Sequence, residues 1–166
     1  MKIIILLFLF MFSPLILASE LPEGWYLTSA DQYLQEDVRW FKGILPNKVV
    51  VDLNDDGMQD SAWILTDKTK TKWALFVALS SDKNNKTLIK LADDEVGLHL
   101  NVGIRFMKAG RYRTACGKGY WKCKHGEPAE IEIKNGAISL HFFESSSSVY
   151  YWSENASKFI RVWLSD

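Results

Sequence analysis

The segment from Val49 to Asp60, VVVDLNDDGMQD, places oxygen-bearing side chains at a spacing that suits a hard cation. It matches the pattern D-x-N-x-D-G-x-x-D, with Gly57 at the point where a calcium loop must turn sharply. The predicted ligands are four side chains and one main-chain carbonyl, from Asp52, Asn54, Asp56, Met58 (carbonyl) and Asp60. The spacing therefore predicts a calcium loop. An Asx-rich hairpin turn that needs no metal is the alternative.

The loop departs from an EF-hand in two ways. Trp63 stands where an EF-hand has its bidentate Glu, and the flanks, Lys48 to Leu53 and Ser61 to Thr66, alternate as strands. Residues 49–64 resemble the calcium loop of FG-GAP and VCBS repeat proteins, which join two strands by an Asp/Asn-rich turn. Those families repeat the loop around a propeller, whereas this chain has it once. Five or six ligands and no terminal Glu predict weak binding, with a Kd on the order of 10⁻⁴ to 10⁻³ M, and the expected role of the ion is to rigidify a hairpin.

The amino terminus has the pattern of a secretion signal. Lys2 precedes the apolar run Ile3 to Phe12, and the segment SPLILAS that follows ends in the small residues Ala18 and Ser19, which suit a cleavage site. We therefore predict a signal peptide over residues 1–18 and a single exported β-rich domain over 19–166, periplasmic or secreted. Ser13 and Pro14 interrupt the run well before the roughly 20 apolar residues that a membrane span needs. No stable membrane anchor is expected after cleavage.

Charge points to no particular partner. The chain has 20 basic and 20 acidic side chains, and removal of residues 1–18 takes away only Lys2, which leaves a net charge of −1. Nucleic acid is therefore not expected as a ligand. The segment from Arg105 to Lys124 holds seven basic residues and no acidic one, which fits either a solvated strand and loop or a surface for an anionic partner.

Cys116 and Cys123 enclose the segment GKGYWK. In an oxidising compartment this short separation predicts a disulfide that closes a surface loop and contributes about 2 to 3 kcal/mol at most. A thiol nucleophile paired with His125 is the alternative. Within the loop, an exposed face for a partner could include Lys118, Tyr120 and Trp121.

Alternating apolar residues and short turns predict a mainly β fold, an antiparallel sheet or sandwich-like meander with a short N-terminal helix. The helix is expected over about Ala30 to Phe41, with Tyr33, Val38 and either Phe41 or Trp40 facing the sheet. Asn135-Gly136 predicts a type I′ hairpin between strands 129–134 and 137–143. The other expected strands are 72–80, 87–92, 102–107, 111–115, 149–152 and 159–164.

No residue pattern typical of an enzyme stands out. The three histidines lack ligand spacing, and the acidic groups at 93–95 and 127–132 read as solvated carboxylates. The run Ser145, Ser146, Ser147 and Ser148 lies between two aromatic strands. It reads either as a flexible solvated hairpin tip or as a small polar loop that enters a partner's cleft.

Two classes of function follow. The first is a non-catalytic exported binding domain for another protein of the envelope or the secreted fraction, or, as a variant, a carbohydrate-binding module. The second is an envelope hydrolase of glycan or peptide, for which a cleft with two converging carboxylates would be required. The mature chain is loosely similar to small periplasmic β-rich proteins, including immunity proteins against cell-wall-degrading effectors. That similarity implies an inhibitor or immunity function, and the first class is the one we predict.

Overall fold

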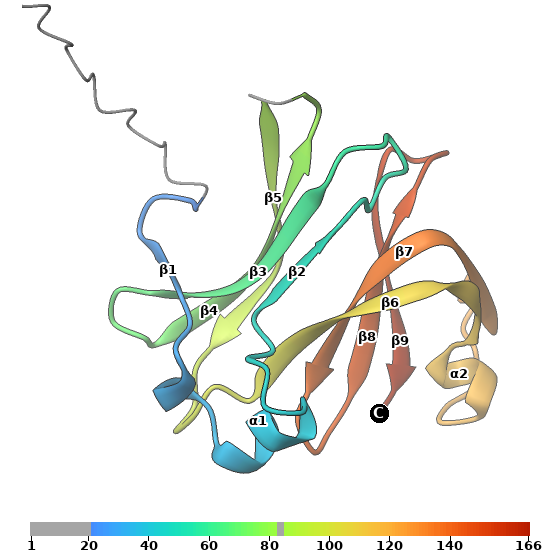
Figure 1. Cartoon of the computed structure of the whole chain (residues 1–166). Helices are drawn as coiled ribbons and strands as arrows, with labels where there is room; N and C mark the ends of the chain where they lie inside the picture. The colour runs from blue at the N-terminus through green and yellow to red at the C-terminus, as the bar shows by residue number, and fades with distance from the viewer. Residues whose placement is uncertain (1–20, 83–84) are drawn as a thin grey trace, which may run out of the picture.

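The computed structural model describes residues 21–82 and 85–166, and the predicted signal peptide lies outside them. The chain forms two antiparallel sheets with short helices at their ends (Figure 1). The first sheet has the order β1-β3-β4-β5, with β2 paired to β3 beside β1, and the second has the order β6-β7-β8-β9. The strands are β1 (Trp25–Leu27), β2 (Lys48–Val51), β3 (Asp60–Asp67), β4 (Lys72–Ser80), β5 (Lys86–Glu95), β6 (Val102–Arg113), β7 (Glu130–Phe142), β8 (Ser147–Ser153) and β9 (Lys158–Ser165). The mainly β prediction is confirmed.

The main core lies between the two sheets. Alternate residues of β3 and β4 point inward, and they pack against the inward residues of β6, β7 and β8. Its fully buried members include Ile64, Leu75, Ile104, Ile138 and Leu140. Since side chains alternate along a strand, these faces must come from every second residue, as the sequence pattern predicts.

The opposite face of the first sheet is also covered. Trp63, Leu65 and Phe76 form a second cluster there, and the N-terminal segment lies on it through Trp25. The rings of Trp25 and Phe76 meet edge to face at 5.2 Å. β3 and β4 are therefore apolar on both sides because both sides are buried.

The predicted hairpin turn at Asn135-Gly136 is wrong, because β7 runs through it without a break. The residue pair lies opposite an irregularity in β6 between Lys108 and Gly110, where the register shifts. Gly136 serves close packing here, since a Cβ at this position would stand 2.6 Å from the ring of Phe106. Two of the predicted strand pairs thus merge into one long bent hairpin, β6 and β7.

The single helix predicted over Ala30 to Phe41 is not confirmed. A 3₁₀ turn (Ala30–Gln32) and the helix α1 (Gln35–Trp40) are separated by Tyr33 and Leu34, which are extended. Tyr33 turns into the main core, where its hydroxyl is 3.2 Å from Thr28 Oγ1. Of the two aromatic alternatives, Phe41 is buried and Trp40 is 55% exposed.

The disulfide between Cys116 and Cys123 is confirmed. It closes a loop around the short helix α2 (Ala115–Lys118), whose first turn is capped by the Thr114 hydroxyl accepting from the N–H of Gly117 at 3.1 Å. This loop lies beside β9, where the Lys118 ammonium donates to the Leu164 carbonyl at 2.8 Å. Within the described residues, no helix is long and apolar enough to cross a membrane.

Gly117 is required by the close approach of α2 to the strand start at Ala129. A Cβ on Gly117 would lie 1.8 Å from the main-chain oxygen of Ala129. We expect Gly117→Ala to lower the free energy of unfolding by about 1–3 kcal/mol, measured by chemical denaturation. Gly97→Ala is the matched control, because a Cβ there meets nothing within 4 Å. Equal losses in the two variants would contradict the packing argument.

Candidate functional site

A cleft of about 560 Å³ lies at one end of the molecule, between α1 and the turn that joins β7 to β8. Figure 1 places α1, this turn and the C-terminus at the same end. The volume is in the range of ordinary ligand sites. Its lining residues are Glu36, Asp37, Trp40, His141, Phe142, Phe143, Glu144, Ser145, Ser146, Ser147 and Ser165.

α1 is held against the second sheet by a stack of aromatic rings and one arginine. The Arg105 Cζ lies 4.2 Å from the centre of the Trp40 ring and 3.9 Å from that of Phe41. Its Nη2 also donates to the Trp40 carbonyl at 2.8 Å. Cation–π contacts and this hydrogen bond fix the end of the helix, and with it the exposed ring of Trp40 at the cleft.

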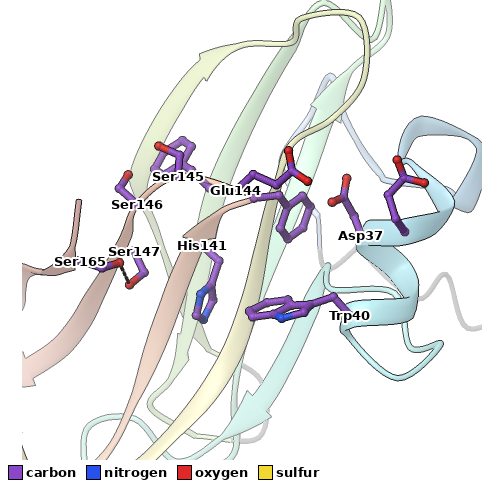
Figure 2. A pocket seen from close by; sticks show the side chains of 11 residues that line it. Asp37, Trp40, His141, Glu144, Ser145, Ser146, Ser147 and Ser165 are labelled. Carbon is purple, nitrogen blue, oxygen red and sulfur yellow. Dashed lines mark hydrogen bonds between the residues drawn. The ribbon is translucent and has the colours of Figure 1, made fainter.

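Carboxylates gather at one side of the cleft. Asp37 and Glu144 point into the space between α1 and the turn in Figure 2, and Glu36 neighbours them on α1. Burial raises the pKa of the Asp37 carboxyl, and the charges of Glu36 and Glu144 raise it further. Nearby His99 opposes this shift. Three acidic groups from two separate segments therefore share one electrostatic environment.

His141 forms part of the opposite wall. Its ring meets that of Trp40 edge to face at 5.4 Å (Figure 2). Its Nε2 shares a hydrogen bond of 2.8 Å with the Ser139 hydroxyl. Burial lowers the pKa of His141 to about 4, with a contribution from the Arg105 charge, so the imidazole is neutral at physiological pH.

The serine run is divided by the structure. Ser145 is in the turn and exposed, and Ser146 follows it with its carbonyl accepting from the N–H of Phe142 at 2.9 Å. Ser147 belongs to β8 and shares a 2.7 Å hydrogen bond with Ser165 (Figure 2). Ser148 is fully buried, and its hydroxyl accepts from Arg161 Nε at 3.1 Å. Three of the four predicted serines thus line the cleft, and the fourth is inaccessible to a partner.

The three candidates in the disulfide loop do not line this cleft. Lys118 is tied to β9 next to Ser165, as described above. The Trp121 indole donates to the Glu127 carboxylate at 3.0 and 3.2 Å, which pins the ring within the loop. Tyr120 is 54% exposed. Lys118 is exposed as well, although its ammonium is hydrogen-bonded, and Trp121 is partly buried.

The predicted calcium loop joins β2 to β3, as the strand pattern requires. Main-chain N–H groups of the turn donate to Asp52 at 2.7 and 2.8 Å, and the Met58 N–H donates to Asp56 at 2.8 Å. Asn54 Nδ2 donates to Asp56 at 2.9 Å, whereas Asn54 Oδ1 is buried and has no hydrogen-bond partner. A buried oxygen without a partner, on a side chain that is bonded to a carboxylate, fits a cation at this place.

Asp60, the last predicted ligand, has a structural task as well. It is fully buried, and its two oxygens accept from the N–H groups of Leu53 and Ser80, each at 2.8 Å. Burial raises the pKa of this carboxyl, these hydrogen bonds oppose the rise, and Asp56 and Asp52 add to it. Across residues 21–82 and 85–166, no group of three or more His, Cys, Asp or Glu side chains is arranged as a metal site.

Sequence reasoning missed the residues that build the cleft, namely Asp37, Trp40, His141 and Glu144. Asp37 reads in the sequence as an ordinary acidic residue in the first turn of a helix, and Glu144 as part of a polar turn. Glu144 has a φ of 56°, a conformation that favours glycine or asparagine in a turn, and a glutamate there gives no sign of it in the sequence. The convergence of these residues depends on how α1 folds onto the second sheet.

Comparison with protein-family models, with curated proteins and with solved structures gave no match. The cleft must therefore be interpreted from its own geometry and chemistry.

The raised pKa of Asp37 predicts that its charge lowers the free energy of unfolding in a pH-dependent way. Between the unfolded value of 3.8 and the higher folded value, the native state binds more protons, so stability falls as pH rises through this window. Asp37→Asn should therefore melt at a slightly higher temperature than the wild type at pH 7. This gain should vanish below about pH 3.8, where the carboxyl is neutral in both states.

The matched control for this measurement is Asp94→Asn, which changes an exposed carboxylate on β5. Thermal unfolding of the three proteins across pH gives the comparison. A loss of stability in Asp37→Asn at pH 7 would show that the Asp37 charge supports the fold.

Proposed function

We propose that the protein is an exported, non-catalytic binding domain that uses the cleft between α1 and the β7–β8 turn to bind another protein of the envelope or the secreted fraction. An inhibitor or immunity protein is the particular form that this proposal takes. The observation that carries it is the cleft itself, where the exposed Trp40 ring, four serines and three carboxylates surround a volume of about 560 Å³.

The chemistry of the lining favours recognition of an inserted segment. Tryptophan supplies a large rigid contact area at a small entropic cost, and such rings dominate the energy of many interfaces. Serine hydroxyls around it can both donate and accept hydrogen bonds. The sheet supports these groups from beneath, because Ser147 is held by Ser165 and Trp40 by Arg105. A preorganised site of this kind loses little entropy when it binds.

We propose further that the β2–β3 loop binds calcium in a structural role. The unpartnered Asn54 Oδ1, together with Asp52 and Asp56, supports this. When bound, the ion would supply positive charge that neutralises neighbouring carboxylates, and Asp60 would hold the loop to the end of β4 whether or not the ion is present.

A hydrolase of glycan or peptide is the second candidate. The observation that favours it is the entry of Asp37 and Glu144 into one cleft, with the pKa of Asp37 raised above its usual value. A pair of carboxyls in which one pKa is raised can act as acid and base.

The binding function is tested by affinity capture with the tagged mature protein from envelope and secreted extracts. We expect a stoichiometric protein partner that is lost with Trp40→Ala, because the exposed ring is the largest contact in the cleft. The matched control is Tyr26→Ala, which removes a ring of similar exposure on β1. A partner that both variants retain would contradict the site. Release of sugar or peptide products by the wild type, lost in Asp37→Asn, would establish the hydrolase instead.

Calcium binding is tested by thermal unfolding with millimolar CaCl₂ and with chelator. Because binding to the native state alone adds RT ln(1 + [L]/Kd), 10 mM calcium should add about 1.5 to 3 kcal/mol for a Kd of about 10⁻⁴ to 10⁻³ M. Asn54→Ala and Asp56→Ala should each abolish this increment. If calcium stabilises these variants as much as the wild type, the ion binds elsewhere.

A further inference from the structure

Asp37 is a buried acidic residue, and the charge of nearby His99 only opposes the rise of its pKa without a hydrogen bond or ion pair between the two. Asp37 is 9% exposed, it lines the cleft, and its side chain makes no hydrogen bond or ion pair with any other described residue. Burying a charge in this way is costly unless it is paired. This carboxylate faces the cleft, where a ligand can reach its oxygens.

Glu144 adds a second free carboxylate from the other wall. It too makes no hydrogen bond or ion pair with another described side chain, and Figure 2 shows it directed toward Asp37. Glu36 is different, because it lies 3.8 Å from Arg39 in an exposed ion pair. Two unpaired negative charges and one weakly paired charge therefore face the same space.

Among the described residues, the basic group that acts on these carboxylates is His99, which lowers the pKa of Asp37 but is not one of the residues that line the cleft. The lining includes no Lys or Arg. His141 is neutral at physiological pH, as shown above. Arg105 lies against Trp40 and Phe41 and is engaged with the Trp40 carbonyl. The lining thus holds no cation to pair with these carboxylates, and it presents them beside an exposed aromatic ring.

We propose that this cleft binds a lysine or arginine side chain from a basic segment of the partner protein, with Asp37 and Glu144 as its counter-ions. This inference rests on the proposed binding function and specifies the chemistry of the partner. An ammonium or guanidinium group matches the two free carboxylates in charge. Its aliphatic stem matches the apolar walls of Trp40 and Phe143. The serines at the mouth can accept hydrogen bonds from the remaining N–H groups.

The alternative ligands fit less well. An anionic segment would add charge of the same sign to an already repulsive group. A neutral sugar can stack on Trp40, but it would leave the buried Asp37 carboxylate without a charged partner. A cationic side chain is the ligand that pairs the Asp37 carboxylate and so offsets the free-energy cost of leaving it unpaired.

The first test uses three N-acetylated, C-amidated tripeptides, of arginine, of lysine and of citrulline, titrated into ¹⁵N-labelled mature protein. Citrulline has the shape of arginine without its charge. We expect the arginine and lysine peptides to shift the Trp40 indole N–H and the Ser145 and Ser146 amides, and citrulline to bind at least about tenfold more weakly. Binding should weaken as salt is raised.

The variant Asp37→Asn/Glu144→Gln removes both charges at nearly constant shape. It should fold at least as well as the wild type, since the Asp37 charge is a cost, and it should bind the cationic peptides at least tenfold more weakly. The matched control, Asp94→Asn/Glu95→Gln, changes two exposed carboxylates on β5 and should bind as the wild type does. Equal binding of all three peptides, or equal losses in both variants, overturns the proposal.

The captured partner separates this inference from the proposed function. If Trp40→Ala loses the partner but Asp37→Asn/Glu144→Gln retains it fully, the cleft is a binding site and the cationic ligand is wrong. If neither variant loses the partner, both proposals fall. If Trp40→Ala and Asp37→Asn/Glu144→Gln both lose the partner, and Lys→Met or Arg→Met substitutions in the partner reproduce the loss, the inference stands. Binding of neutral N-acetylglucosamine oligomers in place of the peptides would assign the cleft to a glycan and also overturns it.

Discussion

The structure depends on the burial of β3 and β4 on both faces. One face packs against the second sheet, and the other is covered by the segment around Trp25. Such a pair of strands cannot stand alone in water, because both rows of side chains are apolar. The second sheet and the N-terminal segment are therefore required by the same two strands. The Asp60 carboxylate secures one end of this pair by accepting two main-chain N–H groups that would otherwise be buried and unpaired.

The cleft is a consequence of how the connection between β1 and β2 crosses to the second sheet. Tyr33 enters the core, Phe41 is buried against Arg105, and Trp40 is left exposed between them and the β7–β8 turn. The apolar contacts that hold α1 in place carry Asp37 with them. The same packing that stabilises the fold thus places a charge where it destabilises it. Sites that bear such a cost in the free protein are typical of ligand recognition.

Two polar features differ in how far their own hydrogen bonds satisfy them. The β2–β3 loop is largely satisfied by its own hydrogen bonds, apart from Asn54 Oδ1, which agrees with a structural role. In the cleft, Glu36 is paired with Arg39 and His99 acts on Asp37 through its charge, whereas Asp37 and Glu144 make no hydrogen bond or ion pair within the described residues. The disulfide loop is bound to β9 by a hydrogen bond from Lys118, and the Trp121 indole holds it internally through Glu127.

The sequence by itself determined the β class, most strands, the disulfide and the geometry of the β2–β3 turn, because these follow from side-chain alternation and from contacts between near neighbours. The prediction at Asn135-Gly136 was wrong because Gly136 allows the close approach of Phe106 and has the composition of a turn without forming one. The helix predicted over Ala30 to Phe41 was not confirmed because Tyr33 is extended and packs into the core. Only the tertiary structure decided the cleft. Asp37 and Glu144 are distant in sequence, and each has an ordinary local explanation. Their meeting depends on the packing of α1 onto the second sheet, which no local pattern encodes.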